Sequence, residues 1–137
     1  MIWWNLRDGW PIVSDAVVDW FGARKKAYFA LKNAQCDQLV CVIDNGEVWA
    51  VNDNLAPVDG HVRVADIASG TVLLDADWAL DSNAAEKIGS VSWSGQGVLS
   101  IRYTVGSAEF RNWYLYGEPP FHLVEIMRLW NFGKEAL

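Results

Sequence analysis

The sequence predicts a mainly β protein, an immunoglobulin-like β-sandwich of about seven strands preceded by a strand, a long loop and a helix. Three observations predict this fold. Short runs of alternating apolar and polar residues recur from residue 37 onward, turn residues separate them, and no helix-length pattern interrupts them. Hydrophobic residues make up 52% of the 137 residues, which is enough to form a packed core.

The first 36 residues follow a different pattern. We expect a short strand over residues 2–6, a loop marked by Gly9 and Pro11, and a turn over residues 19–22. Residues 24–34 have helical periodicity, with Tyr28 and Leu31 on one face. A single strand–loop–helix unit cannot bury its own apolar surface, so this region needs a partner.

The strands of the sandwich are predicted from alternation and turn chemistry. Asn45-Gly46 is among the strongest hairpin signals, and the clearest alternation is that of Leu99, Ile101 and Tyr103 with polar neighbours. The predicted strands cover residues 39–44, 47–52, 61–67, 71–76, 85–93, 99–105 and 108–116.

We therefore divide the chain into residues 1–36, a sandwich over 37–123 and a tail over 124–137. The tail mixes apolar and charged residues. A short helix docked on the sandwich fits this pattern, although Asn131 and Gly133 are unfavourable for it.

Composition excludes several classes of function. The formal net charge is -6, and no basic run exceeds Arg24-Lys25-Lys26, so nucleic acid is not an expected partner. No stretch of about 18 apolar residues predicts a membrane span. His61 and His122 lie far apart and outside any ligand spacing, so we expect no metal, and nothing indicates a cofactor. The compartment is left open.

Nine tryptophans are unusual for a chain of this size. Tryptophan fills cores, and it also stacks on the apolar faces of sugars. Composition alone does not separate these two uses.

A more specific pattern covers the first 31 residues and continues into the sandwich. It consists of Trp4-Asn5-Leu6-Arg7-Asp8-Gly9-Trp10-Pro11, Ser14, Asp19-Trp20-Phe21-Gly22, a helix with Lys26 and Tyr28, and then the weaker motifs Val51-Asn52-Asp53, Arg111-Asn112-Trp113-Tyr114-Leu115 and Pro119-Pro120. In this order the motifs resemble the C-terminal part of glycoside hydrolase family 2 enzymes, closest to the β-mannosidase-like branch.

This resemblance implies that residues 1–36 are the eighth strand, loop and helix of a (β/α)8 barrel, whose active site lies at the C-terminal ends of the strands. Trp4 matches a strand-end tryptophan that forms an apolar floor for the sugar, and Asp8 and Trp10 match loop positions near it. Arg7 replaces the usual asparagine, which puts any polar contact there in doubt.

The family's catalytic residues are two glutamates on barrel strands four and seven, outside the region that this chain matches. Retaining hydrolysis needs two such carboxyl groups about 5 Å apart. The resemblance thus implies no catalytic residue in this chain, which we expect to be inactive alone, and a parent that is a retaining glycoside hydrolase.

Three functions follow from this reasoning. The first is a non-catalytic C-terminal domain that braces the catalytic barrel and shapes the mouth of the active site. The second is a freestanding carbohydrate-binding module that uses Trp113, Tyr114 and Tyr116. The third is an immunoglobulin-like adhesion domain, which leaves the first 36 residues unexplained.

The barrel of a parent enzyme would cover the aromatic residues near the N-terminus, which are Trp3, Trp10, Trp20 and Phe21. In the isolated chain we expect self-association or poor order of the first 30 residues, because apolar patches of that size are rarely left in water.

Overall fold

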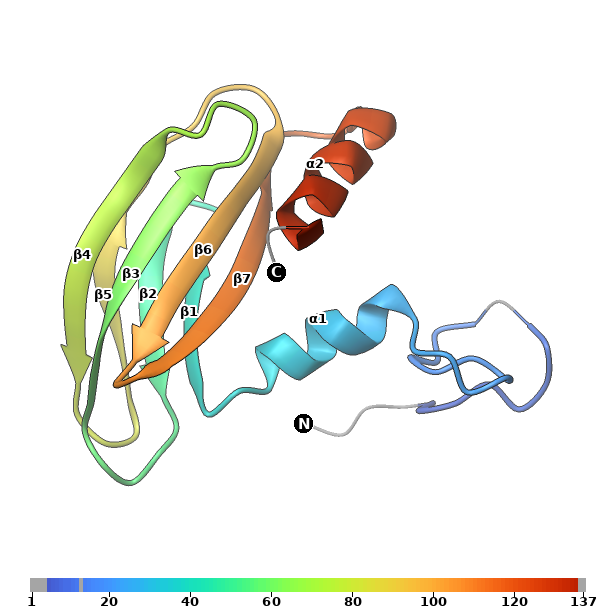
Figure 1. The fold of residues 1–137 in the computed structure, drawn as a ribbon, viewed down its shortest axis with the longest axis horizontal. Helices are drawn as coiled ribbons and strands as arrows, with labels where there is room; N and C mark the ends of the chain where they lie inside the picture. The colour runs from blue at the N-terminus through green and yellow to red at the C-terminus, as the bar shows by residue number, and fades with distance from the viewer. Residues whose placement is uncertain (1–4, 13, 136–137) are drawn as a thin grey trace. The chain divides into compact units, whose positions relative to one another are not determined.

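The computed structural model describes residues 5–12 and 14–135, and the chain divides into two compact units, Met1–Cys36 and Asp37–Leu137. The first unit contains helix α1 (Lys26–Ala34). The second contains helix α2 (Leu123–Glu135) and the seven strands β1 (Gln38–Val42), β2 (Glu47–Asn52), β3 (Val58–Asp66), β4 (Val72–Leu80), β5 (Ala84–Ser90), β6 (Gly97–Val105) and β7 (Ala108–Tyr116) (Figure 1). No helix in the described ranges is long and apolar enough to cross a membrane.

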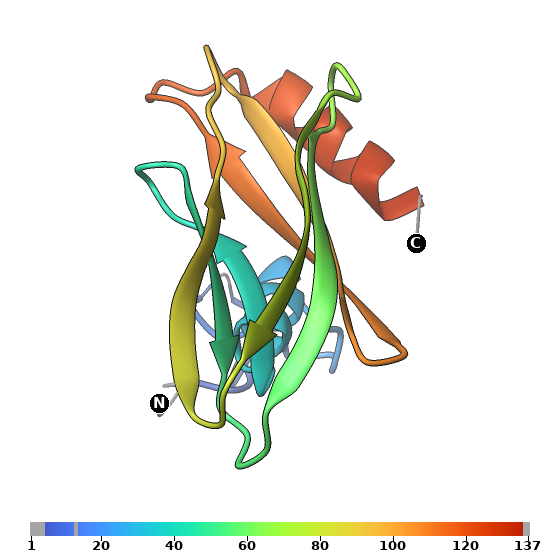
Figure 2. The ribbon, with the colours of Figure 1, turned by 90° about the vertical axis from the view of Figure 1, so that its left-hand side faces the viewer.

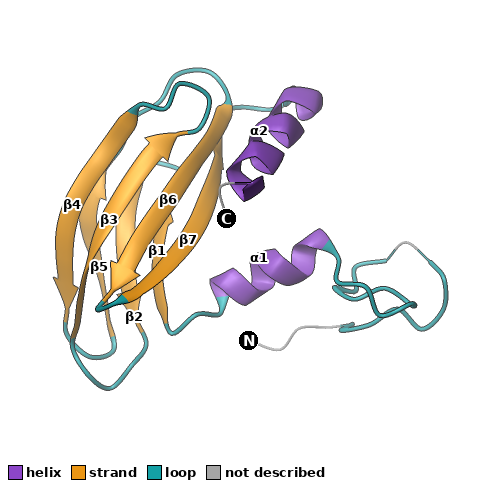
Figure 3. Ribbon diagram, viewed as in Figure 1, coloured by secondary structure: helices purple, strands orange, loops and turns teal. Residues whose placement is uncertain are grey.

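The strands form two antiparallel sheets that face each other as a sandwich (Figure 3). One sheet has the order β1-β2-β5 and the other the order β4-β3-β6-β7. The mainly β, seven-stranded sandwich predicted from the sequence is confirmed.

Alternate side chains of each strand fill the space between the sheets. Val62 and Val64 of β3 and Ile101 of β6 are fully buried, and so are Val40 of β1 and Val48 of β2 on the facing sheet. β-Branched side chains pack well on a pleated surface, and removing them from water stabilises the fold by roughly 1.5–3 kcal/mol each. This layer makes the sandwich a stable unit.

The predicted Asn45-Gly46 turn connects β1 to β2. Gly46 has a φ of 81°, a conformation that side chains disfavour. A Cβ atom at this position would lie 2.2 Å from the carbonyl oxygen of Val91, and the Gly46 carbonyl accepts a hydrogen bond from the Val91 amide (2.8 Å). Only glycine therefore allows the turn to contact the segment that follows β5.

Asn52, at the end of β2, ties two loops together from a fully buried position. Its Nδ2 donates to the carbonyl oxygens of Ala56 and Asp81, each at 2.9 Å, and its Oδ1 accepts from the amide of Asn54 at 3.1 Å. All three partners are backbone groups, so Asn52 has a structural role, as expected of an asparagine at a strand end.

Helix α2 packs on the outer side of the β4-β3-β6-β7 sheet (Figure 2). Ile126 and Leu129, one turn apart, are buried against Val98 of β6, and Trp113 of β7 packs against this cluster. The docked helix expected of the tail is present despite the unfavourable Asn131 and Gly133, because apolar burial outweighs helix propensity.

Some predicted boundaries differ from the structure. The helix predicted from residue 24 begins at Lys26, because the backbone of Lys25 is extended and its amide donates to the carbonyl of Val17 (2.9 Å). β5 ends at Ser90 and not at residue 93, since the Val91 amide binds the β1–β2 turn. Most of the strand predicted over residues 2–6 lies outside the described residues.

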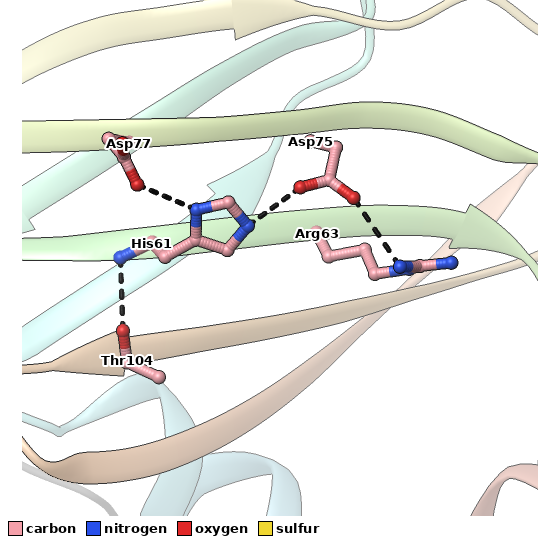
Figure 4. Close-up of polar contacts among 5 residues, drawn as sticks. All are labelled: His61, Arg63, Asp75, Asp77 and Thr104. Carbon is pink, nitrogen blue, oxygen red and sulfur yellow. Dashed lines mark hydrogen bonds and ion pairs between the residues drawn. The ribbon is translucent and has the colours of Figure 1, made fainter.

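The solvent-facing side of β3 and β4 carries a polar cluster centred on His61 (Figure 4). Its Nδ1 is 2.7 Å from Asp77 Oδ1, and its Nε2 is 2.7 Å from Asp75 Oδ1. Arg63 Nη1 lies 3.4 Å from the other oxygen of Asp75, and Thr104 Oγ1 accepts from the His61 amide. Both ring nitrogens donate only when the imidazole is protonated, so the hydrogen bonds to Asp77 and then Asp75 raise the pKa of His61.

We expect this cluster to make the stability of the sandwich depend on pH. Since the pKa of His61 is higher in the folded protein than its ordinary value of about 6.5, its stabilising contribution is complete below about pH 6.5 and is lost as the pH rises through the raised pKa. The urea midpoint, followed by tryptophan fluorescence, should fall across this window. His61→Gln should abolish the fall and His122→Gln should retain it; an unchanged fall in His61→Gln would contradict the assignment.

Replacing Asn52 by alanine should destabilise the sandwich by about 1–3 kcal/mol, because the carbonyls of the two loops lose their buried donor. Equilibrium urea unfolding measures the change. Asp53→Ala is the matched control: this neighbouring side chain is exposed, and we expect a change within about 0.5 kcal/mol. Equal effects of the two substitutions would show that Asn52 does not hold the loops.

Candidate functional site: the loop around Asp8

The residues that resemble a barrel segment lie in the first unit, where three stretches of backbone run side by side. The amide of Val18 donates to the carbonyl of Leu6 (2.9 Å), and the amide of Asp8 donates to the carbonyl of Val18 (3.0 Å). On the other side, Val18 forms an antiparallel bridge with Arg24. Residues 16–18 therefore lie between residues 6–8 and 24–25 and fix the start and end of the loop.

Asp8 is the buried polar centre of this unit, with a side chain that is fully removed from solvent. The Ser14 hydroxyl donates to Oδ1, and the Lys25 ammonium lies 2.8 Å from Oδ2. The Lys25 ammonium also donates to the Ser14 carbonyl (3.3 Å), and the Ser14 hydroxyl accepts from the Ala16 amide (3.0 Å). One carboxylate thus connects the beginning of the loop to its end.

The hydrogen bond from Lys25, followed by that from Ser14, lowers the pKa of Asp8. The carboxylate is therefore ionised and carries no proton to donate at neutral pH, so it is unsuited to act as a general acid. Its surroundings suit a role in holding the loop. Among residues 5–12 and 14–135, no group of three His, Cys, Asp or Glu residues is placed to hold a metal ion.

The turn predicted over residues 19–22 is present and displays two aromatic side chains. The Asp19 carboxylate accepts from the Ala23 amide (2.7 Å), and Gly22 has a φ of 88°. Between them, Trp20 and Phe21 are 43% and 81% exposed. The preceding loop also exposes an aromatic side chain, that of Trp10, which is 64% exposed. Trp10, Trp20 and Phe21 are therefore displayed to solvent and not packed in a core.

The described part of the first unit has almost no core of its own. Its only buried apolar residues are Ala16 and Val17, and no residue of α1 is buried. The large apolar side chains that remain exposed are Leu6, Trp10, Ile12, Trp20, Phe21 and Phe29. This is the pattern of a segment whose apolar surface needs a partner.

The structure describes two of the three predicted site residues. Asp8 and Trp10 share one loop, with Asp8 buried and Trp10 exposed, while Trp4 lies outside the described residues. Lys25, which falls within the helix predicted over residues 24–34, precedes the observed helix and pairs with Asp8. Sequence reasoning missed this pair, since the two residues are distant in the chain and no local spacing connects them.

The aromatic platform considered for a carbohydrate-binding module is not formed. Tyr116 is buried, its hydroxyl donates to Asp66 (2.7 Å), and burial, reinforced by Asp66, raises its pKa to about 12. Trp113 packs against the α2 cluster on the opposite side of the sheet from Tyr114. The core and the helix therefore occupy the surfaces that a flat platform would need.

Comparison with known proteins gives matches at the level of structure. No family model matches the chain, and no curated protein sequence matches it. The fold is similar to part of the β-D-mannosidase from Dictyoglomus thermophilum, with a TM-score of 0.66 and 22% identity over 83% of this chain. It is also similar to part of the exo-β-D-glucosaminidase CsxA, with a TM-score of 0.66 and 18% identity over 84% of this chain.

The matched regions make up only 16% and 15% of those two enzymes, so this chain spans about one sixth of their length. Both belong to glycoside hydrolase family 2, the family that the sequence motifs resemble. At these identities the likeness establishes the fold: most of this chain has the fold of a segment found in two family 2 glycosidases.

Proposed function

We propose that this chain is the C-terminal accessory segment of a family 2 exo-glycosidase. Residues 1–36 complete the catalytic barrel, and the sandwich braces the barrel and shapes the mouth of its active site. The observation that carries the proposal is the exposed apolar surface of the first unit, whose described residues include two buried apolar side chains and six large exposed ones.

The energetics favour a covering partner. Burying a large apolar side chain contributes roughly 1.5–3 kcal/mol, so covering the six exposed side chains amounts to something on the order of 10 kcal/mol. A (β/α)8 barrel that lacks its last unit offers such a partner, because each helix of the barrel packs on its neighbours and on the strands inside. The fold shared with two family 2 glycosidases supports this choice over an unrelated partner.

Within such a barrel, we assign different roles to the three predicted site residues. Asp8 positions the loop through Lys25 and Ser14. Trp10 is exposed on the same loop and supplies apolar surface near the sugar, a role that the family resemblance also implies for Trp4. Two glutamates of the barrel catalyse the hydrolysis. The substrate is a β-glycoside, and a β-mannoside is the first candidate.

The first test compares this chain alone with the same chain joined to its upstream coding sequence. We expect the joined protein to hydrolyse an aryl β-mannoside or a related aryl β-glycoside, and the chain alone to be inactive.

Trp20→Asp combined with Phe21→Asp should prevent assembly of the joined protein, because it places charges on the covered surface. Leu55→Asp, at a 94% exposed position of the sandwich, is the control and should leave activity unchanged. Turnover by the chain alone, or an upstream sequence without a barrel, would overturn the proposal.

The second test breaks the Asp8–Lys25 pair in the joined enzyme. Asp8→Asn and Lys25→Met should each lower kcat/KM on the order of 100-fold, because a loop displaced by about 1 Å misplaces the groups around the sugar. The double variant should be no worse than either single one, since both remove the same contact. Lys26→Met is the matched control on the exposed side of α1. Additive losses would show that Asp8 acts independently of Lys25.

A further inference from the structure

A depression of about 740 Å³ opens at one end of the sandwich, where three connections meet. The β1–β2 turn contributes Asp44, and the connection from β5 to β6 contributes Trp93 and Gln96. The end of β7 contributes Tyr114, and the segment after it contributes Glu118. Its volume is within the usual range for small-molecule sites. It lies in the second unit and includes none of the residues of the loop around Asp8.

Two aromatic residues, Trp93 and Tyr114, form part of the wall of the depression, and the core holds them in place. Trp93 is half-buried, with its ring 5.4 Å from that of Tyr114 and 5.6 Å from that of Tyr116. Tyr116 is itself held by Asp66 from inside the sandwich. Trp93 lines the depression and these ring contacts hold its indole in place, so stacking on it costs little conformational entropy.

The rim is rigid as well. The side-chain amide of Gln96 donates to the carbonyl oxygens of Glu118 and Pro120 and accepts from the amide of His122 (3.2 Å). Gly117, with a φ of 108°, comes so close to the Gly95 carbonyl that a Cβ atom would lie 2.7 Å from it. These contacts hold the β5–β6 connection against the segment after β7, so the depression is formed before any ligand arrives.

The charged side chains that line the depression are all acidic. Asp44 and Glu118 are exposed carboxylates, and no lysine, arginine or histidine is among the residues that line the depression. Asp44 accepts a hydrogen bond from the Tyr114 hydroxyl (3.1 Å), which orients its carboxylate group. A cationic ligand is therefore favoured and an anionic one is disfavoured.

We propose that this depression binds an amino sugar, which stacks the apolar face of its ring on Trp93 and directs its ammonium group to Asp44 and Glu118. An amino sugar combines a flat apolar face, a rim of hydroxyl groups that carboxylates and backbone groups can bind, and a single positive charge. This site is independent of the proposed glycosidase function, because neither the barrel nor the loop around Asp8 takes part in it.

The test is a titration of the full chain with glucosamine, glucose and glucuronate at about pH 6, where the amine is protonated. The signals of the Trp93 indole N–H and of the amides of Gly95 and Gly117 are followed by NMR. We expect glucosamine to bind with a Kd of the order of millimolar, glucose at least about threefold more weakly at low salt, and glucuronate not at all.

Substitutions test whether Glu118 and Asp44 bind the ammonium group of the amino sugar. Glu118→Gln and Asp44→Asn should each weaken glucosamine binding roughly threefold to fivefold, as expected for exposed ion pairs, and leave glucose binding nearly unchanged. Glu109→Gln is the matched control, an exposed carboxylate at the opposite end of the β6–β7 hairpin. The proposal is overturned if no saturable binding is seen, if binding leaves the Trp93 signal unmoved, or if the two carboxylate variants bind glucosamine as the unmodified chain does.

Discussion

The packed layer between the two sheets is the constraint on which the rest of the molecule depends. Val62, Val64 and Ile101 on one sheet face Val40 and Val48 on the other, all fully buried. Because side chains alternate along a strand, a slip of one residue would turn each of these groups to solvent. The layer thus fixes the strand register, and the register in turn places the turns and loops at the two ends of the sandwich.

Strand alternation is a local signal, which is why the seven strands could be predicted with little error in the middle of each run. The ends were less predictable, as in β4, which continues to Leu80 through Asp75 and Asp77. Two carboxylates normally indicate that a strand has ended. Here both bind His61 of the neighbouring strand, and a cross-strand partner of this kind is invisible in the local sequence.

The contacts within the candidate sites were harder to predict than the strands, because most of them join residues that are distant in the sequence. Motif order placed Asp8 and Trp10 in one loop, and this required no knowledge of the fold. The Asp8–Lys25 pair, the burial of Tyr116 and the wall formed by Trp93 all depend on contacts between distant segments. A tryptophan in a glycine-rich connection, as in Trp93-Ser94-Gly95-Gln96-Gly97, was the one available signal for the depression, and it does not distinguish a binding residue from a core residue.

The uneven distribution of buried residues between the two units has an evolutionary consequence. Substitutions in the core of the sandwich need only be compatible with one another, because that core is built from its own residues. Under the proposed function, substitutions on the exposed apolar surface of the first unit must be compatible with the barrel that covers it. The sandwich is then free to diverge in sequence, or to be exchanged between enzymes by recombination, whereas residues 1–36 must change together with that barrel.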